Sequence, residues 1–306
     1  MLIFAASDKG GTGRSVTSAN LAYHRALAGD DVCYLDFDFG SPTAAAVFDV
    51  ADARQAVEDS GLHAYLTGEV SEPARIDILA ETEMQELREN LPPGCGRMVL
   101  MPGDLSGGEF ATTDDNLRRC VDLLTKLYYE FDLVIVDLSA GRSYAVDMAL
   151  EATAQPEMSE VTARWLVFHR WTHQHVAAAA NLVFGKRGII AGGVARGHDE
   201  EALSSAIRFV RAAVPDHNSS LWSQVSPTQS KWMRTTDGDL KQLASNLGIG
   251  YSRVLGSVPL EPVLQWREKL ITEDDVLNSQ IANMDTWEEL RKLSRRLTDD
   301  ESWEQA

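Results

Sequence analysis

Cysteine is scarce in this chain. The three cysteines among its 306 residues, Cys33, Cys95 and Cys120, stand far apart and form no CxxC pair. That spacing argues against a bound metal cluster and favours reduced, buried thiols, as in a cytoplasmic protein. There is also no run of about 18 apolar residues and no basic stretch before the first apolar segment. We therefore expect a cytoplasmic protein that is neither exported nor held in a membrane.

Basic side chains are outnumbered as well. The chain carries 28 lysines and arginines against 46 aspartates and glutamates, a net charge of −18. This charge repels DNA and anionic lipid at long range, so binding to either needs a local basic patch. One window, Arg164 to Arg196, has five basic residues and no acid. It is either an ordinary solvated face or a patch for DNA or an acidic protein, and the net charge disfavours non-specific DNA.

Short apolar runs alternate with longer segments of helical period. This order predicts an α/β fold with a mostly parallel central sheet and helices on both faces, and continuous apolar runs are typical of strands buried on both sides. The predicted strands are Leu2–Ala6, Val32–Asp36, Met98–Met101, Leu133–Leu138, Trp165–Phe168, Ile189–Val194 and Val254–Val258. The clearest predicted helices are Ser15–Ala28, Asn116–Tyr129, Val176–Phe184 and Glu200–Ala213.

The chain is predicted to form one domain over residues 1–297, followed by an acidic tail at 298–306. Residues 215–238, rich in Ser, Thr, Asn and Gln, are predicted to be an inserted loop. Its tryptophans, Trp222 and Trp232, either fold back onto the core or anchor a partner around residues 231–234, since Trp and Arg often anchor interfaces. Apolar residues on one face of the segment 286–297 predict a helix that packs on the core, because a lipid-binding helix would have a basic polar face.

A glycine-rich segment follows the first predicted strand. Residues 7–15 read Ser-Asp-Lys-Gly-Gly-Thr-Gly-Arg-Ser, and a helical pattern begins at once. Glycines let successive backbone N–H groups point toward a phosphate, and the next helix offers the positive end of its dipole. The sequence therefore predicts a phosphate-binding loop here.

Two later strands end in carboxylates. The first ends in Asp36 and Asp38, two residues apart and on one side of the pleat. The second has four apolar residues before Asp137, the Walker B pattern that holds Mg²⁺. Each aspartate alone could simply cap the next helix. Because ligand sites of parallel sheets lie at the carboxyl ends of the strands, we expect the three aspartates to converge on the glycine-rich loop.

Residues 9–15 resemble the deviant Walker A box, KGGxGK[ST], of the ParA/MinD group of P-loop ATPases. The resemblance spans residues 1–297, with 215–238 as an addition. The further segments that carry it are Ala19–Ala22, Gly29, Val32 to Asp38, Leu100–Gly103, Phe131 to Asp137, Ala140–Gly141 and Leu255–Pro259.

The resemblance implies roles for individual residues. Lys9 would be the signature lysine that reaches the partner's nucleotide in an ATP-dependent homodimer, and Asp38 would orient the attacking water. The implied catalytic residues are thus Lys9, Arg14 and Asp38. The implied nucleotide-binding residues are Lys9, Gly10, Gly11, Thr12, Gly13, Arg14, Ser15, Val16, Val258, Pro259 and Leu260, the last three beside the adenine of ATP. The implied Mg²⁺ residues are Ser15, Asp36 and Asp137.

The chain departs from the family pattern at the second lysine of the box, where it has Arg14. Arginine keeps the positive charge and offers a two-pronged donor, but its planar head is larger than an ammonium group. We therefore predict that nucleotide binding survives and that hydrolysis is slow. An ATP-binding scaffold with little or no turnover stays open as an alternative.

The leading interpretation is an Mg-ATP-dependent, dimerising switch ATPase that regulates the positioning, partitioning or assembly of a partner, with a protein activator or cargo. A metabolic ATP-dependent ligase on the same scaffold would need an additional substrate site, for which no candidate is evident. The histidines His169, His173 and His175 could be read as a metal site. Their place at a strand-to-helix junction favours contact with the partner subunit instead.

Overall fold

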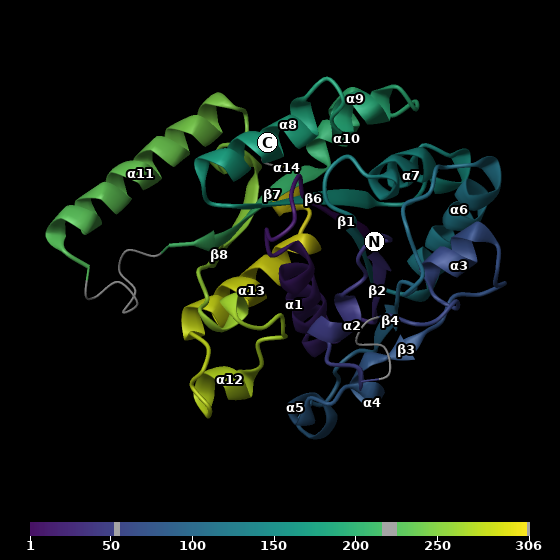
Figure 1. The fold of residues 1–306 in the computed structure, drawn as a ribbon, viewed down its shortest axis with the longest axis horizontal. Coiled ribbons are helices and arrows are strands. Elements are labelled where there is room, and N and C mark those ends of the chain that lie inside the picture. The colour runs from purple at the N-terminus through teal and green to yellow at the C-terminus, as the bar shows by residue number, and fades with distance from the viewer. Residues whose placement is uncertain (52–55, 216–224, 305–306) are drawn as a thin grey trace.

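The protein is built around one eight-stranded sheet (Figure 1). The computed structural model describes residues 1–51, 56–215 and 225–304. The strand order is β3-β4-β2-β5-β1-β6-β7-β8, and every neighbouring pair is parallel except β3 and β4. The strands are β1 (Leu2–Ala6), β2 (Val32–Phe37), β3 (Ile76–Asp77), β4 (Met98–Met101), β5 (Leu133–Leu138), β6 (Ala163–Arg170), β7 (Ile207–Val214) and β8 (Val254–Pro259). The α/β fold class predicted from the sequence is confirmed.

Helices cover both faces of the sheet, because side chains alternate along each strand. In β1, Leu2 and Phe4 enter one apolar core with the helices at 114–130, 144–153 and 173–184, whereas Ile3 and Ala5 enter the other with the helices at 14–27 and 284–297. The helices are α1 (Arg14–Leu27), α2 (Ala44–Val47), α3 (Leu62–Thr67), α4 (Ile78–Glu81), α5 (Gln85–Glu89), α6 (Asp114–Glu130), α7 (Tyr144–Thr153), α8 (His173–Phe184), α9 (Ile189–Val194), α10 (Glu200–Ser205), α11 (Pro227–Asn246), α12 (Glu273–Leu277), α13 (Met284–Leu297) and α14 (Glu301–Glu304). None of these described helices could cross a membrane, by length and hydropathy.

One predicted strand is wrong, and one predicted helix is right only in its first part. Residues 189–194 form helix α9 rather than a strand. The segment 200–213, predicted to be one helix, forms helix α10 only at Glu200–Ser205, and from Ile207 it forms strand β7, which runs to Val214. Apolar runs of this length do not distinguish a buried strand from a buried helix, and Arg208 and Arg211 are spaced as on one helical face. In the strand they point to opposite sides of the sheet, where Arg208 lies over Trp303 and Arg211 over another tryptophan ring, 4.1 Å away.

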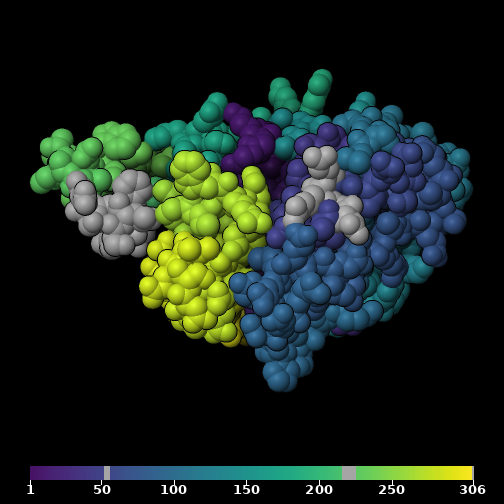
Figure 2. Space-filling view, turned by 60° about the horizontal axis from the view of Figure 1, so that its bottom comes forward, coloured from purple at the N-terminus to yellow at the C-terminus, as the bar shows by residue number. Residues whose placement is uncertain are grey.

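Helix α11 replaces much of the loop predicted at 215–238. It begins at Pro227 after a reciprocal capping box between Ser226 and Gln229, a sequence signal of a helix start that the polar composition obscured. Trp232 on this helix is 67% exposed, so the expectation that it folds back onto the core is wrong, and Trp222 lies outside the described residues. Only Leu240 and Ala244 of α11 are buried. The helix extends away from the rest of the molecule at one end (Figures 1 and 2).

The C-terminal helices pack on the core, as expected for 286–297. Leu290, Leu293 and Leu297 of α13 are at most 1% exposed. Within the predicted acidic tail, α14 places Trp303 at 5% exposure under the guanidinium of Arg164, 4.6 Å from its ring. Apolar burial and a cation–π contact therefore hold the described part of the tail against the sheet.

His24 makes stability depend on pH. This histidine of α1 is 4% exposed, and its Nε2 has no hydrogen-bond partner in the described part of the chain. Burial, with Arg291 and Arg295 nearby, lowers the pKa of His24 to about 3. The unfolded chain, with an ordinary histidine pKa of about 6.5, therefore binds the extra proton between these values, and stability falls as pH falls below 6.5.

We expect this single histidine to cost about 2 kcal/mol at pH 5 relative to neutral pH. The variant His24→Leu should accordingly lose less stability than wild type between pH 7 and pH 5, as measured by urea unfolding. The exposed residue His173 gives the control, His173→Leu. Equal losses in wild type and His24→Leu would contradict the assignment.

Candidate nucleotide site

The glycine-rich segment forms a loop between β1 and α1. Gly11 has a φ of 69° and Gly13 a φ of 78°, left-handed conformations that glycine adopts without a steric penalty. Gly13 is the N-cap residue of α1 and takes a left-handed conformation there. A Cβ added to Gly10 or Gly11 would meet no atom within 4 Å. The loop therefore leaves open space at the positive end of a 14-residue helix, the geometry of an anion site.

A cavity of about 240 Å³ lies beside this loop. Gly11, Gly13 and Val16 line it from one side and Val258 and Pro259 from the other. In Figure 2 the purple N-terminal segment reaches the surface next to the yellow-green segment that follows β8. The structure thus brings together two parts of the predicted nucleotide site that are far apart in the sequence.

The cavity lining differs in part from the sequence prediction. Leu260 does not line the cavity, and its backbone N–H donates to the carbonyl of Val214. Sequence reasoning missed Arg170, Gln265 and Glu268, which do line it. For Gln265 and Glu268, the one available signal was that they follow Pro259 closely in the chain. No sequence signal distinguished Arg170 from its neighbours.

The three predicted aspartates converge at the carboxyl ends of β2 and β5. Asp36 and Asp137 are direct partners in the parallel register of these strands and are 2% and 1% exposed. Asp38 follows β2, with its side chain 23% exposed. Asp36 accepts hydrogen bonds from the backbone N–H groups of Ala44 at 2.9 Å and Asp38 at 3.3 Å. These bonds fix the turn that carries Asp38.

Burial raises the pKa of Asp36 to about 7, and the neighbouring charge of Asp137 adds to the shift. Two carboxylates side by side in a poorly hydrated site repel each other, so a cation must compensate the charge that remains. A nearby arginine supplies that cation.

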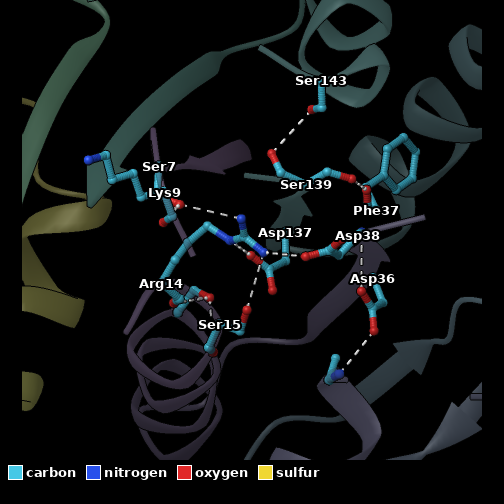
Figure 3. Close-up of polar contacts among 12 residues, drawn as sticks. Ser7, Lys9, Arg14, Ser15, Asp36, Phe37, Asp38, Asp137, Ser139 and Ser143 are labelled. Atoms are coloured by element: carbon cyan, nitrogen blue, oxygen red, sulfur yellow. Dashed lines mark hydrogen bonds and ion pairs between the residues drawn. The ribbon is translucent and has the colours of Figure 1, made fainter. Parts of the chain in front are cut away.

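Arg14 points into the carboxylate cluster (Figure 3). Its Nη2 lies 3.1 Å from Oδ2 of Asp38, and its Nε donates to Oδ1 of Asp137. Further contacts link Nη2 to the Ser15 hydroxyl at 3.4 Å and Nη1 to the Ser7 hydroxyl at 3.5 Å. Burial opposes the charged form, but Asp137 and Asp38 outweigh it and raise the pKa of Arg14 above its ordinary value. The guanidinium is therefore a permanent charge in the site.

Lys9 lies on the other side of the loop. Its side chain extends away from Arg14 and the aspartates in Figure 3. It is partly exposed and forms no ion pair within the described residues. Its ammonium is therefore directed out of the cluster that Arg14 neutralises.

The three histidines of the β6–α8 junction do not face a common centre. His169 is 1% exposed, and its Nδ1 lies 3.1 Å from the backbone oxygen of Arg170. The ring of His175 meets the Thr172 hydroxyl at 2.8 Å, whereas His173 is exposed. Among the described residues, no group of three or more His, Cys, Asp or Glu side chains could hold a metal ion by itself.

The oxygen groups present nevertheless fit Mg²⁺ when a phosphate accompanies it. This ion favours oxygen ligands and usually binds through one or two carboxylates plus substrate phosphates. The Ser15 hydroxyl and the Asp137 carboxylate both lie at the loop, where their contacts with Arg14 bring them together. These residues would hold the ion, and Asp36 would support them.

The acid-free window is not a continuous basic patch. Arg164 bonds to Asp300, and Arg196 pairs with Asp147 at 2.8 Å, so acids from other elements neutralise both. Lys186 and Arg187 remain exposed.

Comparisons with known proteins agree with this geometry. Residues 3–264 match the family described as the CobQ/CobB/MinD/ParA nucleotide binding domain. No curated protein matches the chain.

Solved structures share the fold. MinD from Aquifex aeolicus, in a MinC:MinD cell division protein complex, is 15% identical with a TM-score of 0.60, covering 97% of this chain and 94% of that one. MinD from Pyrococcus horikoshii complexed with Mg-ADP is 15% identical with a TM-score of 0.55, covering 98% and 96%. A putative plasmid partition protein from Borrelia burgdorferi bound to AMPPNP is 14% identical with a TM-score of 0.57, covering 96% of each chain. The sheet and helices therefore form the P-loop fold of MinD and ParA, and the chain belongs to the CobQ/CobB/MinD/ParA nucleotide binding domain family.

Proposed function

We propose that the chain is a cytoplasmic Mg-ATP-dependent switch ATPase that dimerises with ATP and regulates the positioning, partitioning or assembly of a protein partner. One observation carries the proposal: the glycine-rich loop, Asp38 and Asp137 meet at the carboxyl ends of β1, β2 and β5. Ligands of parallel α/β sheets bind at that edge.

The nucleotide would lie across the loop and the adjoining cavity. The backbone N–H groups of residues 10–15 and the N-terminus of α1 would bind the phosphates. The base would enter the cavity beside Val258 and Pro259. The similar MinD from Pyrococcus horikoshii is complexed with Mg-ADP, and the Borrelia burgdorferi partition protein is bound to AMPPNP, which supports a nucleoside polyphosphate with Mg²⁺ as the ligand.

Each polar residue has a distinct task in this proposal. Ser15 and Asp137 would hold Mg²⁺, which offsets negative charge on the phosphates when bound. The Asp38 carboxylate, with 23% of its side chain exposed, can accept a hydrogen bond from water and orient it toward the phosphates. Lys9, directed away from the cluster, would reach the nucleotide of a second copy.

A second candidate is an ATP-binding scaffold with little turnover. The ion pairs of Arg14 with Asp38 and Asp137 favour it, because they engage the carboxylates that hydrolysis would need. The two candidates differ in turnover rate and share the nucleotide site.

Replacing Lys9 tests the dimer. We expect Lys9→Ala to keep the fold and to lose the ATP-dependent dimer and the hydrolysis that depends on it, because its ammonium would bridge the two copies. Light scattering with Mg-ATP and with ADP measures the dimer, and phosphate release measures turnover. The exposed arginine that lies 3.7 Å from Asp8, the residue before Lys9, gives the control variant Arg142→Ala. Hydrolysis by Lys9→Ala as fast as by wild type would remove the sandwich-dimer mechanism.

The two carboxylates should separate binding from hydrolysis. Asp38→Ala should bind nucleotide and accumulate as a dimer, because the residue that orients water is lost while the phosphate loop remains. Asp137→Ala should instead weaken Mg²⁺-dependent nucleotide binding. Calorimetric titration with Mg-AMPPNP distinguishes them, and equal binding defects in both variants would refute this division of labour.

Arg14→Lys should raise the rate of hydrolysis. The cation of the loop must follow charge onto the phosphates in the transition state, and the planar guanidinium is larger than an ammonium group and is placed less well for this in a tight loop. A misplacement of about 2–3 kcal/mol slows the reaction roughly 30- to 150-fold. Single-turnover hydrolysis at saturating Mg-ATP measures the effect. A lysine variant that binds normally and hydrolyses no faster would show Arg14 to be the working catalytic cation.

A further inference from the structure

The guanidinium of Arg14 contacts oxygen atoms of both residues that would hold the metal, Ser15 and Asp137, and of the neighbouring Asp38. It meets Oδ2 of Asp38 at 3.1 Å and the Ser15 hydroxyl at 3.4 Å, and it donates to Oδ1 of Asp137. We propose that Arg14 is the resident counter-ion of the metal site, so that the protein binds a divalent cation only together with a polyphosphate that draws the guanidinium away. The inference rests on the proposed use of this site for Mg-nucleotide.

The charge balance of the cluster supports this role. The Asp36 and Asp137 side chains are almost completely buried and adjacent in the register of β2 and β5. Asp38 directly follows β2. Within the described part of the chain, the ion pairs of Asp38 and Asp137 are both made by Arg14. Removing one partner of a buried ion pair leaves an uncompensated charge, which is strongly destabilising. Free Mg²⁺ must therefore displace a compensating charge that the protein already contains.

The shape of the guanidinium suits this site better than an ammonium would. Its Nε, Nη1 and Nη2 each meet a different neighbour, Asp137, Ser7 and Asp38. An ammonium carries its three donors on one atom and cannot span three separated oxygens in the same way. Arginine also keeps its proton at every accessible pH. Its charge consequently cannot leave by deprotonation, only by movement of the side chain.

A polyphosphate provides the reason for such a movement. Arg14 is the first residue of α1, beside the loop whose backbone N–H groups would bind phosphate. Guanidinium–phosphate pairs form two parallel hydrogen bonds and are among the stronger charge-assisted contacts. Turning Arg14 toward the phosphates would release Asp137 and Ser15 for the metal. Metal and nucleotide would then each raise the affinity for the other, as thermodynamic linkage requires.

The test measures divalent-cation binding with no nucleotide present. Mn²⁺ alone is titrated, and the free ion is followed by electron paramagnetic resonance. We expect wild type to show no site above the weak surface binding of an acidic protein. The variant Arg14→Met removes the charge at similar side-chain length, and we expect it to gain one site at least tenfold tighter. That site should vanish in Arg14→Met combined with Asp137→Asn.

A matched control comes from the same helix. Arg25 also pairs with an aspartate, Asp30, at the far end of α1. Arg25→Met therefore loses a partly buried ion pair without touching the metal site, and it should bind Mn²⁺ as wild type does. Thermal unfolding gives a second readout. Arg14→Met should melt lower in EDTA and recover part of the loss with millimolar Mg²⁺, while wild type and Arg25→Met respond equally little.

A third variant covers the case in which Arg14→Met does not fold. Arg14→Lys keeps one positive charge but makes fewer contacts. Its affinity for Mn²⁺ should therefore lie between the affinity of wild type and that of Arg14→Met. Equal Mn²⁺ affinity in wild type and every folded Arg14 variant would overturn the inference. Titration of wild type with Mg-ATP separates this result from failure of the proposed function. Absence of Mg-ATP binding refutes the nucleotide switch, whereas Mg-ATP binding with unchanged Mn²⁺ affinities refutes only the role of Arg14.

Discussion

The contact between Arg14 and the carboxylates at the ends of β2 and β5 organises the site. It joins the first residue of α1 to Asp38 and Asp137, so the phosphate loop, the turn after β2 and the end of β5 are held as one unit. Because the guanidinium and Asp137 are buried and Asp38 is only partly exposed, the contact is little screened by solvent. The site therefore contains a compensating positive charge before any ligand enters, and a cation that binds there must exchange with it.

The sheet topology makes this contact possible. β5 lies between β1 and β2, in the register that pairs Asp137 with Ala5 on one side and Asp36 on the other. Three chain segments that are far apart in the sequence thereby end at one edge. The same parallel arrangement places β7 and β8 further along, where Val258 and Pro259 complete the cavity beside Gly13. Burial of both sheet faces by helices fixes these ends, and the polar groups at the edge need only short turns to meet.

Much of this arrangement could be predicted because it depends on local patterns. Continuous apolar runs identified six of the eight strands. The aspartates at the ends of two of them, Asp36, Asp38 and Asp137, were expected to converge because parallel strands end at one edge of a sheet. The two-residue strand β3 offered no periodicity, and β7 was misassigned because Arg208 and Arg211 imitate a helical spacing that only tertiary contacts with Trp303 and Trp171 explain. The direction of Arg14 was equally inaccessible, since a side chain's rotamer in a cluster depends on charges far away in sequence.

The sheet topology of this chain is shared with the solved structures, and Arg14 is its departure from the KGGxGK[ST] pattern. A shared fold at about 15% identity does not carry a function with it, so the function has to be argued from the site. In that site, Arg14 stands in place of the expected lysine, and a ligand that binds there has to displace its guanidinium from the aspartates. A nucleotide that displaces Arg14 has to offset the loss of a buried ion pair with Asp137 and a partly buried one with Asp38, and this cost lowers its net affinity. The same cost keeps Arg14 on the aspartates when no ligand is bound, whereas the phosphates would favour its other position. A switch requires two such states, each favoured under a different condition.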